Sequence, residues 1–341
     1  MPWKGIKNPY FIWLSEIILQ QTRVQQGMAY YNKFITNYPT VQRLASAPID
    51  QVLKDWEGLG YYTRARNLHA CAKAIVNKHN GSLPNTMIGL LSLPGIGPYT
   101  AAAIGSFAFQ LPVALVDGNV YRVLTRFFDI DTCLSTAKAK KQIQTLAQEL
   151  LKEPSSTYNQ AIMDFGATVC KPALPLCHEC PMQRNCLAYK NGTVAERPVK
   201  KRKKPIRHRH FIRFVIHSHD HIIIKQRTSN DIWEGLYDFP ELELVKKSTN
   251  NTDLITSYLQ KLGLNSPDLK QKKSAEYHQK LSHQKISTFF VEVFYEGDLQ
   301  SLLLEQKDKI VLTNKKNLLT FAFPKIIGEY LKEASVYLNV E

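Results

Sequence analysis

The stretch LPGIGPYTAAAI, residues 93–104, decides the fold of the N-terminal half of this chain. Gly95 and Gly97 allow a tight turn between two predicted helices, because glycine adopts backbone conformations that other residues avoid. Such a turn can aim backbone N–H groups at a phosphate with no side chain in the way. An ordinary corner between two helices is the alternative, and this stretch alone does not decide between them.

A carboxylate follows the turn in VDGNVYRVL, where Asp117 stands twenty residues after Gly97 at the start of another predicted helix. A carboxylate at a helix start is often only a cap. Asp117 is therefore a candidate for capping or for catalysis. Asn119, two residues further on, can steady it or contact a reacting group.

Four of the six cysteines crowd into one loop, with the spacing C-x6-C-x2-C-x5-C. Four thiolates suit zinc or a [4Fe-4S] cluster. Structural zinc sites usually contain two short pairs, and here only one pair is short, so the spacing modestly favours iron-sulfur. Chance clustering of core cysteines is a third alternative. The cysteines concerned are Cys170, Cys177, Cys180 and Cys186.

Composition limits the class of protein. The length of 341 residues favours two or three domains. The net charge of +15 favours a polyanionic partner. No run approaches the roughly 18 apolar residues of a membrane span, and MPWKGIKNPY lacks the layout of a signal peptide. We therefore expect a cytoplasmic protein without a membrane partner.

The pattern of apolar residues changes along the chain. Residues 10–190 show helical periodicity, whereas RFVIHS, HIIIKQR and ISTFFVEVFY are strand-like runs further on. Between them, RPVKKRKKPIRHRH is basic and has little to bury. The expected order is an all-α region over 1–190, a basic linker over 191–210 and an α+β domain over 211–341.

Together, the hairpin, Asp117 and the cysteine spacing resemble the endonuclease III superfamily of DNA glycosylases, which has a helix-hairpin-helix element. The resemblance implies a [4Fe-4S] cluster on the four cysteines, a catalytic role for Asp117, and DNA contacts at Gly95 and Gly97. It divides the helical region into a six-helix module over about 10–125 and an iron-sulfur module formed by about 1–9 with 126–190.

Two positions distinguish members of this superfamily. Members that also cut the strand carry a lysine just after the hairpin, which forms a Schiff base with the sugar. Here that position is Tyr99, and a phenol cannot form an imine. SEIILQQTRV, residues 15–24, resembles the MutY-type adenine DNA glycosylases and implies that Glu16 is the catalytic acid; a solvated helix face is the alternative.

The MutY-type resemblance implies a double-stranded DNA substrate with adenine opposite 8-oxoguanine or guanine. The adenine is flipped out and Glu16 protonates it, while Asp117 either stabilises the cationic sugar or traps it covalently. Tyr99 and Asn119 position the sugar and Asp117. Ordinary surface roles remain the alternative for Tyr61 and Gln160. The other implied contacts are Gln21 and Tyr61 in the base stack, Thr22 beside them, Leu59 at the opposite base, and Gln160 and Trp3 at the adenine.

The C-terminal domain resembles the Nudix-like domain of the same enzymes. A Nudix hydrolase needs a glutamate-rich REUxEE helix to bind magnesium, and no such run occurs here. In YHQKLSHQKIS, residues 277–287, Leu281 replaces the phenylalanine of a Phe-Ser-His motif, while Ser282 and His283 remain. The resemblance implies that these three residues recognise 8-oxoguanine, although His283 alone could be a surface loop histidine.

Several alternatives remain at this point. An endonuclease III-like enzyme with lyase activity on oxidised pyrimidines is disfavoured by Tyr99, Glu16 and the C-terminal domain. A non-catalytic iron-sulfur DNA-binding protein and a diphosphate hydrolase are the others. Relatives carry a further helix before the segment that MPWK resembles, so we expect a weakened cluster module. We expect a monomer, and no protein partner is indicated.

Overall fold

The computed structural model describes residues 5–133, 136–199, 205–228, 231–246, 251–264, 270–300 and 309–338. The chain forms two compact units. The first comprises residues 1–46 and 67–203, and the second comprises residues 47–66 and 204–341. Within the described ranges, no helix is long and apolar enough to cross a membrane.

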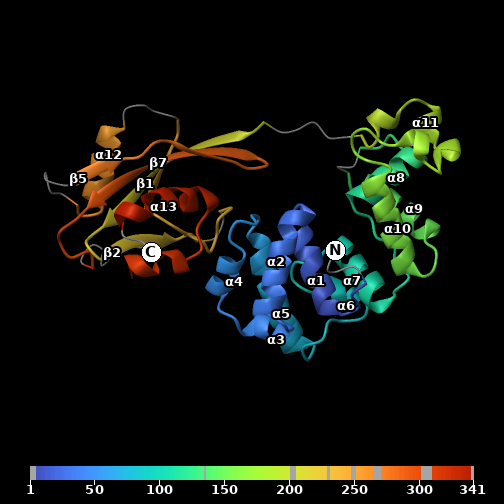
Figure 1. The fold of residues 1–341 in the computed structure, drawn as a ribbon, viewed down its shortest axis with the longest axis horizontal. Helices are drawn as coiled ribbons and strands as arrows, with labels where there is room; N and C mark the ends of the chain where they lie inside the picture. The colour runs from blue at the N-terminus through green and yellow to red at the C-terminus, as the bar shows by residue number, and fades with distance from the viewer. Residues whose placement is uncertain are drawn as a thin grey trace. The chain divides into compact units, whose positions relative to one another are not determined.

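The first unit is helical (Figure 1). Its α-helices are α1 (Pro9–Leu19), α2 (Val24–Asn37), α3 (Val41–Ser46), most of α5 (Thr63–Lys78), α6 (Met87–Leu91), α7 (Pro98–Phe109), α8 (Gly118–Phe127), α9 (Ala137–Leu150), α10 (Ser155–Thr168) and α11 (Leu187–Lys190).

Helix α1 lies inside this unit. Its N-terminus is capped by Asn8, whose side chain accepts a hydrogen bond from the backbone N–H of Tyr10 at 2.9 Å. Pro9 occupies the first turn, where its missing N–H costs no helical hydrogen bond. Most of its side chains are buried, including Trp13 and Leu14. A helix that is apolar on nearly every side must be packed on nearly every side.

The predicted hairpin joins α6 to α7. Gly95 has φ +74°, and a Cβ built on it would lie 2.6 Å from the Cβ of Asn67, so both backbone and space require glycine there. Gly97 is different, because its φ of −87° is open to any residue and a Cβ on it would meet nothing within 4 Å. Only the first of the two glycines is needed for the turn.

The second unit contains a mixed sheet with the strand order β3-β2-β1-β7-β5. Its long central strands β1 and β7 run parallel, from Arg207 opposite Gln284 to His217 opposite Phe294. The strands are β1 (Arg207–His217), β2 (His221–Gln226), β3 (Tyr237–Asp238), β4 (Glu241–Leu244), β5 (Lys270–Lys273), β6 (Tyr277–Lys280), β7 (Gln284–Phe294) and β8 (Ile310–Asn314).

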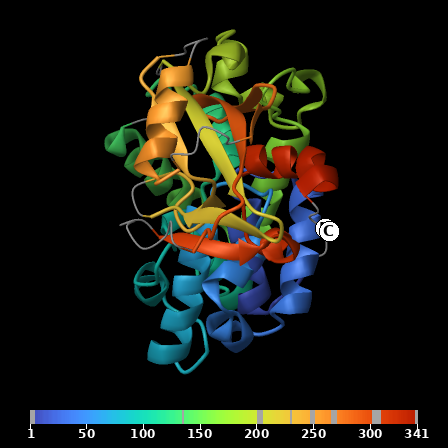
Figure 2. The same cartoon turned by 90° about the vertical axis from the view of Figure 1, so that its left-hand side faces the viewer.

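A helix covers each face of this sheet (Figure 2). On one face Leu259 of α12 (Thr252–Lys261) packs with Phe214 and Val291. On the other face Tyr330 of α13 (Lys325–Leu338) stacks on Phe290 with ring centroids 3.8 Å apart. The expected α+β domain is therefore present.

The stretch 191–210, expected as a linker, is ordered at both ends. Arg197 forms an ion pair with Asp129 at 2.8 Å, and β1 already begins at Arg207. Arg209, counted as linker, binds Glu243 at 2.7 Å. The expectation was wrong at these ends because the basic side chains have carboxylate partners and strand neighbours that the local sequence does not reveal.

A segment of the N-terminal half belongs to the second unit. Residues 47–66 contain helix α4 (Ile49–Asp55) and the turn after it. Arg66 donates a hydrogen bond of 2.5 Å to the backbone carbonyl of Glu234. The sequence places this segment in the helical region over 1–190, whereas its packing places it with residues 204–341.

Candidate active site

Glu16 and Tyr99 meet across two helices. Glu16 lies on α1, and Tyr99 lies in the first turn of α7, directly after the hairpin. The Tyr99 hydroxyl donates a hydrogen bond of 2.8 Å to Oε2 of Glu16. Gln20, one turn after Glu16, donates to the Thr100 hydroxyl at 3.2 Å. These contacts place a carboxyl group and a phenol at one point of the helical unit.

The surroundings of Glu16 favour its protonated form. Burial raises the pKa of the Glu16 carboxyl to about 7, against the hydrogen bond from Tyr99, which lowers it. The nearby charge of Asp117 adds to the increase. A carboxyl with a pKa near neutrality can donate a proton at physiological pH, as general acid catalysis requires.

Asp117 is the N-cap of α8 and is held by three N–H donors. Its Oδ1 accepts from the backbone N–H of Asn119 at 2.8 Å and of Val120 at 2.7 Å. Its Oδ2 accepts from the side-chain amide of Asn119 at 2.8 Å. Capping and catalysis are therefore not exclusive here, because the bonds that cap the helix also fix the carboxylate in one orientation.

A cavity of about 500 Å³ opens beside Glu16. Gln160 also lines it, and its Nε2 donates to Oδ1 of Asp164 at 2.9 Å. Asp117 does not line this cavity, and Trp3 lies outside the described residues. The lining comprises Gly5, Ile6, Lys7, Ile12, Ser15, Glu16, Phe107, Gln110, Ser156, Thr157, Gln160, Ala161 and Asp164.

Gln21 follows Gln20, the C-cap of α1, and has φ +54°, in the left-handed region that residues with a Cβ seldom adopt. Its side chain is exposed. The next residue, Thr22, turns its hydroxyl back to the carbonyl of Gln20 at 3.2 Å. Backbone strain of this kind often occurs at functional positions, and here it projects an amide outward.

The turn after α4, in the second unit, also contains a residue with positive φ and an exposed side chain. Tyr61 has φ +52°, and its ring is 49% exposed. Leu59, two residues earlier, is buried at 7% exposure. Tyr61 is therefore an accessible aromatic side chain on a strained backbone, whereas Leu59 is much less accessible to solvent.

The four clustered cysteines line one small apolar cavity. Burial raises the pKa of Cys177, and the neighbouring Cys170 and Cys180 raise it further. Four thiols that line one cavity form a donor set for a cationic group. In the described part of the chain, no three His, Cys, Asp or Glu side chains converge to bind a single metal ion.

Two buried arginines of α8 bind the cysteine loop, and the sequence interpretation missed both. Arg126 lies 3.5 Å from Sγ of Cys170 and donates to the carbonyl of Lys171 at 2.7 Å. Arg122 donates to the carbonyl of Cys170 at 2.7 Å and to Oδ1 of Asn119 at 2.8 Å. The available signal was their spacing of four residues, which places both on one side of the helix that follows Asp117.

The predicted opposite-base residues form the tip of the β6–β7 hairpin. Leu281 and Gln284 close a turn through a backbone hydrogen bond of 2.8 Å. Ser282 and His283 at its centre are exposed, with the Ser282 hydroxyl 3.2 Å from Nδ1 of His283. Two polar groups are thus presented to the solvent together.

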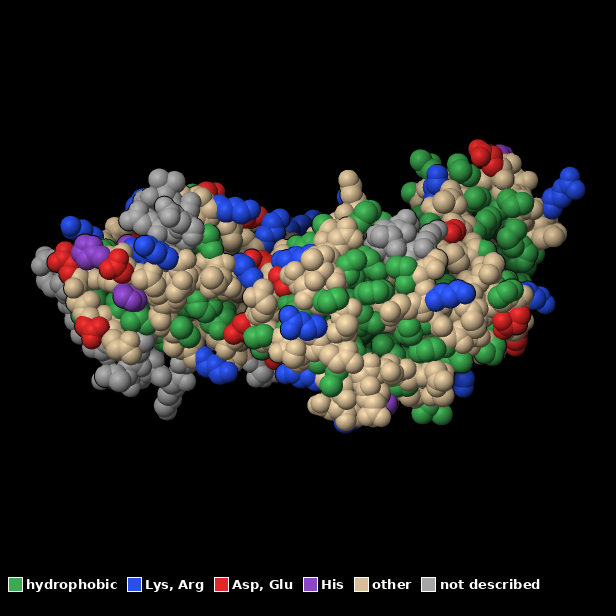
Figure 3. Space-filling view, turned by 60° about the horizontal axis from the view of Figure 1, so that its bottom comes forward, with side chains coloured by type: hydrophobic (Ala, Val, Ile, Leu, Met, Phe, Trp, Pro, Cys, Tyr) green, Lys and Arg blue, Asp and Glu red, His purple; other side chains and the backbone are tan. Residues whose placement is uncertain are grey.

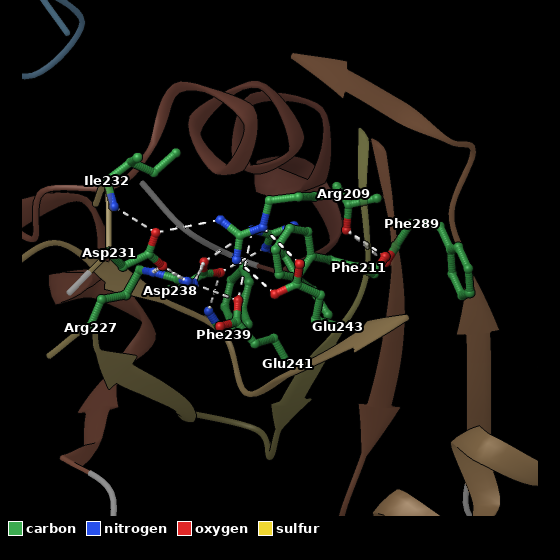
Figure 4. Close-up of polar contacts among 12 residues, drawn as sticks. Arg209, Phe211, Arg227, Asp231, Ile232, Asp238, Phe239, Glu241, Glu243 and Phe289 are labelled. Atoms are coloured by element: carbon green, nitrogen blue, oxygen red, sulfur yellow. Dashed lines mark hydrogen bonds and ion pairs between the residues drawn. The ribbon is translucent and has the colours of Figure 1, made fainter. Parts of the chain in front are cut away.

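A cluster of carboxylates in this unit pairs with arginines (Figure 4). Asp238 is fully buried and binds Arg213 at 2.9 Å and Arg227 at 2.8 Å. Glu241 binds Arg227 at 2.5 Å, and burial with the charge of Asp238 raises its pKa to about 7. These carboxylates already have cationic partners, so they are not available for a magnesium ion.

On the face of the molecule drawn in Figure 3, the basic side chains are scattered. Arg184 in the cysteine loop is exposed, whereas Lys171 is half-buried. The net charge of +15 favours a polyanionic partner.

Comparisons with known proteins agree with this arrangement. Residues 14–153 match the HhH-GPD superfamily of base excision DNA repair proteins, and residues 212–333 match the Nudix domain. The adenine DNA glycosylase of Buchnera aphidicola subsp. Baizongia pistaciae (strain Bp) is 39% identical over 247 residues, which cover 71% of this chain and 69% of that protein. The enzyme of the same name from Buchnera aphidicola subsp. Schizaphis graminum (strain Sg) is 34% identical over 284 residues, which cover 83% of this chain and 80% of that protein.

Among solved structures, a thermostable thymine-DNA glycosylase matches with a TM-score of 0.51 and 30% identity, covering 56% of this chain and 88% of that one. The matched families confirm the expected fold class and the resemblance drawn from the motifs. The chain therefore belongs to the HhH-GPD superfamily of base excision DNA repair proteins and, within it, to the MutY-type adenine DNA glycosylases.

Proposed function

We propose that this protein removes adenine from double-stranded DNA where adenine is mispaired with 8-oxoguanine or guanine, by hydrolysing the N-glycosidic bond. The enzyme is an adenine DNA glycosylase of base excision repair. The observation that carries the mechanism is the 2.8 Å hydrogen bond between Tyr99 and Glu16 at the wall of the cavity.

Glu16 acts as the general acid. Adenine leaves the sugar readily only after a ring nitrogen has gained a proton, and a Glu16 carboxyl with a pKa of about 7 can supply it. As the bond breaks, the sugar becomes cationic and the Asp117 carboxylate stabilises it, until water adds to the cationic carbon and loses a proton to complete the hydrolysis. Tyr99 orients Glu16, and Asn119 orients Asp117.

Gln160 selects adenine. Its Nε2 donates to a carboxylate oxygen of Asp164, which leaves its carbonyl oxygen as the acceptor for an amino group in the cavity. Adenine carries such a group on its six-membered ring. Trp3 belongs to the same proposal through the family resemblance alone.

Strand cleavage is weak or absent. Tyr99 occupies the position at which the strand-cutting relatives carry lysine, and its hydroxyl cannot form an imine with the opened sugar. The product is therefore an intact strand with an abasic site. The glycine turn at Gly95 and Gly97 holds the DNA backbone, while Gln21, Thr22, Leu59 and Tyr61 enter or flank the base stack.

A [4Fe-4S] cluster fits the cysteine loop. Cys170, Cys177, Cys180 and Cys186 line one cavity, and four thiolates of one loop are the usual ligands of such a cluster. The cluster would supply a structural brace, because base removal changes no oxidation state. Arg126 fixes the loop around it through Lys171 and the Cys170 sulfur.

The second unit reads the base opposite adenine through Leu281, Ser282 and His283. Ser282 and His283 offer hydrogen-bonding groups at an exposed tip. Leu281 can wedge but cannot stack. The enzyme works as a monomer on nucleoid DNA in the cytoplasm.

The test is excision from duplexes with adenine opposite 8-oxoguanine, guanine, cytosine or thymine, scored as strand breaks with and without alkali. We expect breaks only after alkali and only opposite the two purines. Breaks without alkali would favour an endonuclease III-like lyase, and no base loss from any duplex would favour a non-catalytic DNA-binding protein.

A further inference from the structure

The turn between α4 and α5 is held rigidly by its own side chains. The indole N–H of Trp56 and a guanidinium N–H of Arg64 each donate to the carbonyl of Gly60 at 3.0 Å. The Arg64 guanidinium also lies over the Tyr61 ring, 5.5 Å from its centroid. Arg64 therefore contacts both the backbone of this turn and the exposed Tyr61 ring.

Side chains on both sides of this turn bind residues of the C-terminal half within the second unit. Before the turn, Glu57 accepts a hydrogen bond of 2.9 Å from the backbone N–H of Phe323, and Lys54 donates to the carbonyl of Phe321 at 2.9 Å. After the turn, Arg66 binds both the carbonyl and the carboxylate of Glu234, at 2.5 and 3.3 Å. The turn is thus tethered at two points.

An aromatic cluster runs from one tether toward the opposite-base hairpin. Phe323 stacks on Phe239, whose ring lies 6.2 Å from Phe290. Phe290 stacks on Tyr330 and lies 5.3 Å from Tyr277. Tyr277 begins β6, four residues before Leu281. Packed rings transmit a displacement because a protein interior has few voids.

We propose that Glu57 and Arg66 are positioning residues that couple the opposite-base hairpin to the Tyr61 turn, so that contact with 8-oxoguanine sets the position of the Tyr61 ring. The inference rests on the proposed reading of the opposite base by this unit. Guanine offers the hairpin fewer contacts than 8-oxoguanine and therefore places the ring less firmly. The tethers thereby contribute to the preference for one opposite base over the other.

The experiment measures single-turnover excision of adenine opposite 8-oxoguanine and opposite guanine. In Glu57→Ala and Glu234→Ala we expect the ratio of the two rates to fall about 5-fold, the effect of one ordinary hydrogen bond. Glu57→Gln keeps an acceptor for the Phe323 N–H and should restore the ratio. Glu329→Ala, which removes a solvent-exposed ion pair with Lys325 in the same unit, is the matched control.

A double variant tests the coupling itself. If the two sites were independent, the fold-decreases of the ratio in the two single variants would multiply in the double variant. For coupled sites, we expect the fold-decrease in the variant that combines Glu57→Ala with His283→Ala to be at least about 3-fold smaller than that product. Multiplying effects, or an unchanged ratio in Glu57→Ala, would overturn the inference while the wild-type excision stands. A wild-type protein that releases no adenine would instead overturn the proposed function.

Discussion

The Tyr99 hydroxyl donates a hydrogen bond to the Glu16 carboxylate at 2.8 Å, although the two residues stand 83 positions apart in the sequence. This bond opposes the effect of burial on the pKa of Glu16, which nevertheless rises to about 7. The phenol at this position thus orients the acid and also tunes it. The first prediction follows from the sign of that effect.

Tyr99→Phe should move the pH dependence of excision upward. Activity requires protonated Glu16, so the wild-type rate should fall tenfold per pH unit above about pH 7. Removing the hydrogen bond that lowers the pKa leaves burial unopposed, and the fall should begin at a higher pH. Single-turnover rates measured between pH 5 and pH 9 should show this fall in activity shifted upward by on the order of one pH unit. A descending limb that moves to lower pH would contradict the role given to Tyr99.

Asp117→Asn should abolish adenine release while DNA binding survives, because it removes the charge and little volume. We expect a loss of at least about 10³-fold, comparable with the removal of other electrostatic stabilisers of a transition state. Excision assays would be paired with binding to the same duplex. Near-normal excision in this variant would exclude Asp117 from catalysis.

Tyr99→Lys should gain strand cleavage. An amine at this position can attack the sugar and form an imine, which borohydride reduces to a stable protein–DNA adduct. Denaturing gels would detect the adduct, with Tyr99→Phe as the control that offers no amine. If the lysine variant forms no adduct, the residue does not face the sugar.

Asp164→Ala should weaken the selection of adenine. Without its acceptor the Gln160 amide can rotate, and the rate on adenine should fall about 5-fold, as for the loss of one hydrogen bond. The rate on a purine that lacks the amino group should stay within about 2-fold, because nothing on that base needs the Gln160 oxygen. An equal fall on both bases would indicate a general disturbance of the cavity.

Cys177→Ser should lower the iron content and the melting temperature of the purified protein. One ligand of four would be exchanged for a harder donor, and the loop that Arg126 binds would lose its brace. Visible absorbance, iron analysis and thermal melting would record the change. Cys133→Ser, at a cysteine that does not line the cavity, is the control and should keep its iron.

The sequence predicted the parts of this molecule that depend on local pattern. The helices around Glu16 and Asp117, the turn at Gly95, and the long strands β1 and β7 all have periodicity or glycine signals that act over a few residues. The hairpin, Asp117 and the cysteine spacing together carried the resemblance to the family. The bond between Tyr99 and Glu16 was not predicted, because it joins two helices that no local pattern relates.

Other features depend on distant partners and escaped prediction. In the sequence, the spacing of Arg122 and Arg126 indicates only an ordinary helix face. Their role becomes evident in the structure, where both bind the cysteine loop. Arg209 reads as linker until Glu243 pairs with it. The tether between Arg66 and Glu234 joins positions 168 residues apart, so neither segment predicts it alone.

The cap on α8 has a consequence for the behaviour of the enzyme on warming. Helix ends fray before helix centres, and the first turn of α8 can open only if the Asp117 carboxylate releases the N–H groups of Asn119 and Val120. The group that holds this helix end closed is also the one assigned to the sugar cation. Loss of activity on heating should therefore precede global melting, since an early, reversible loosening of a single turn already misplaces the reacting oxygen.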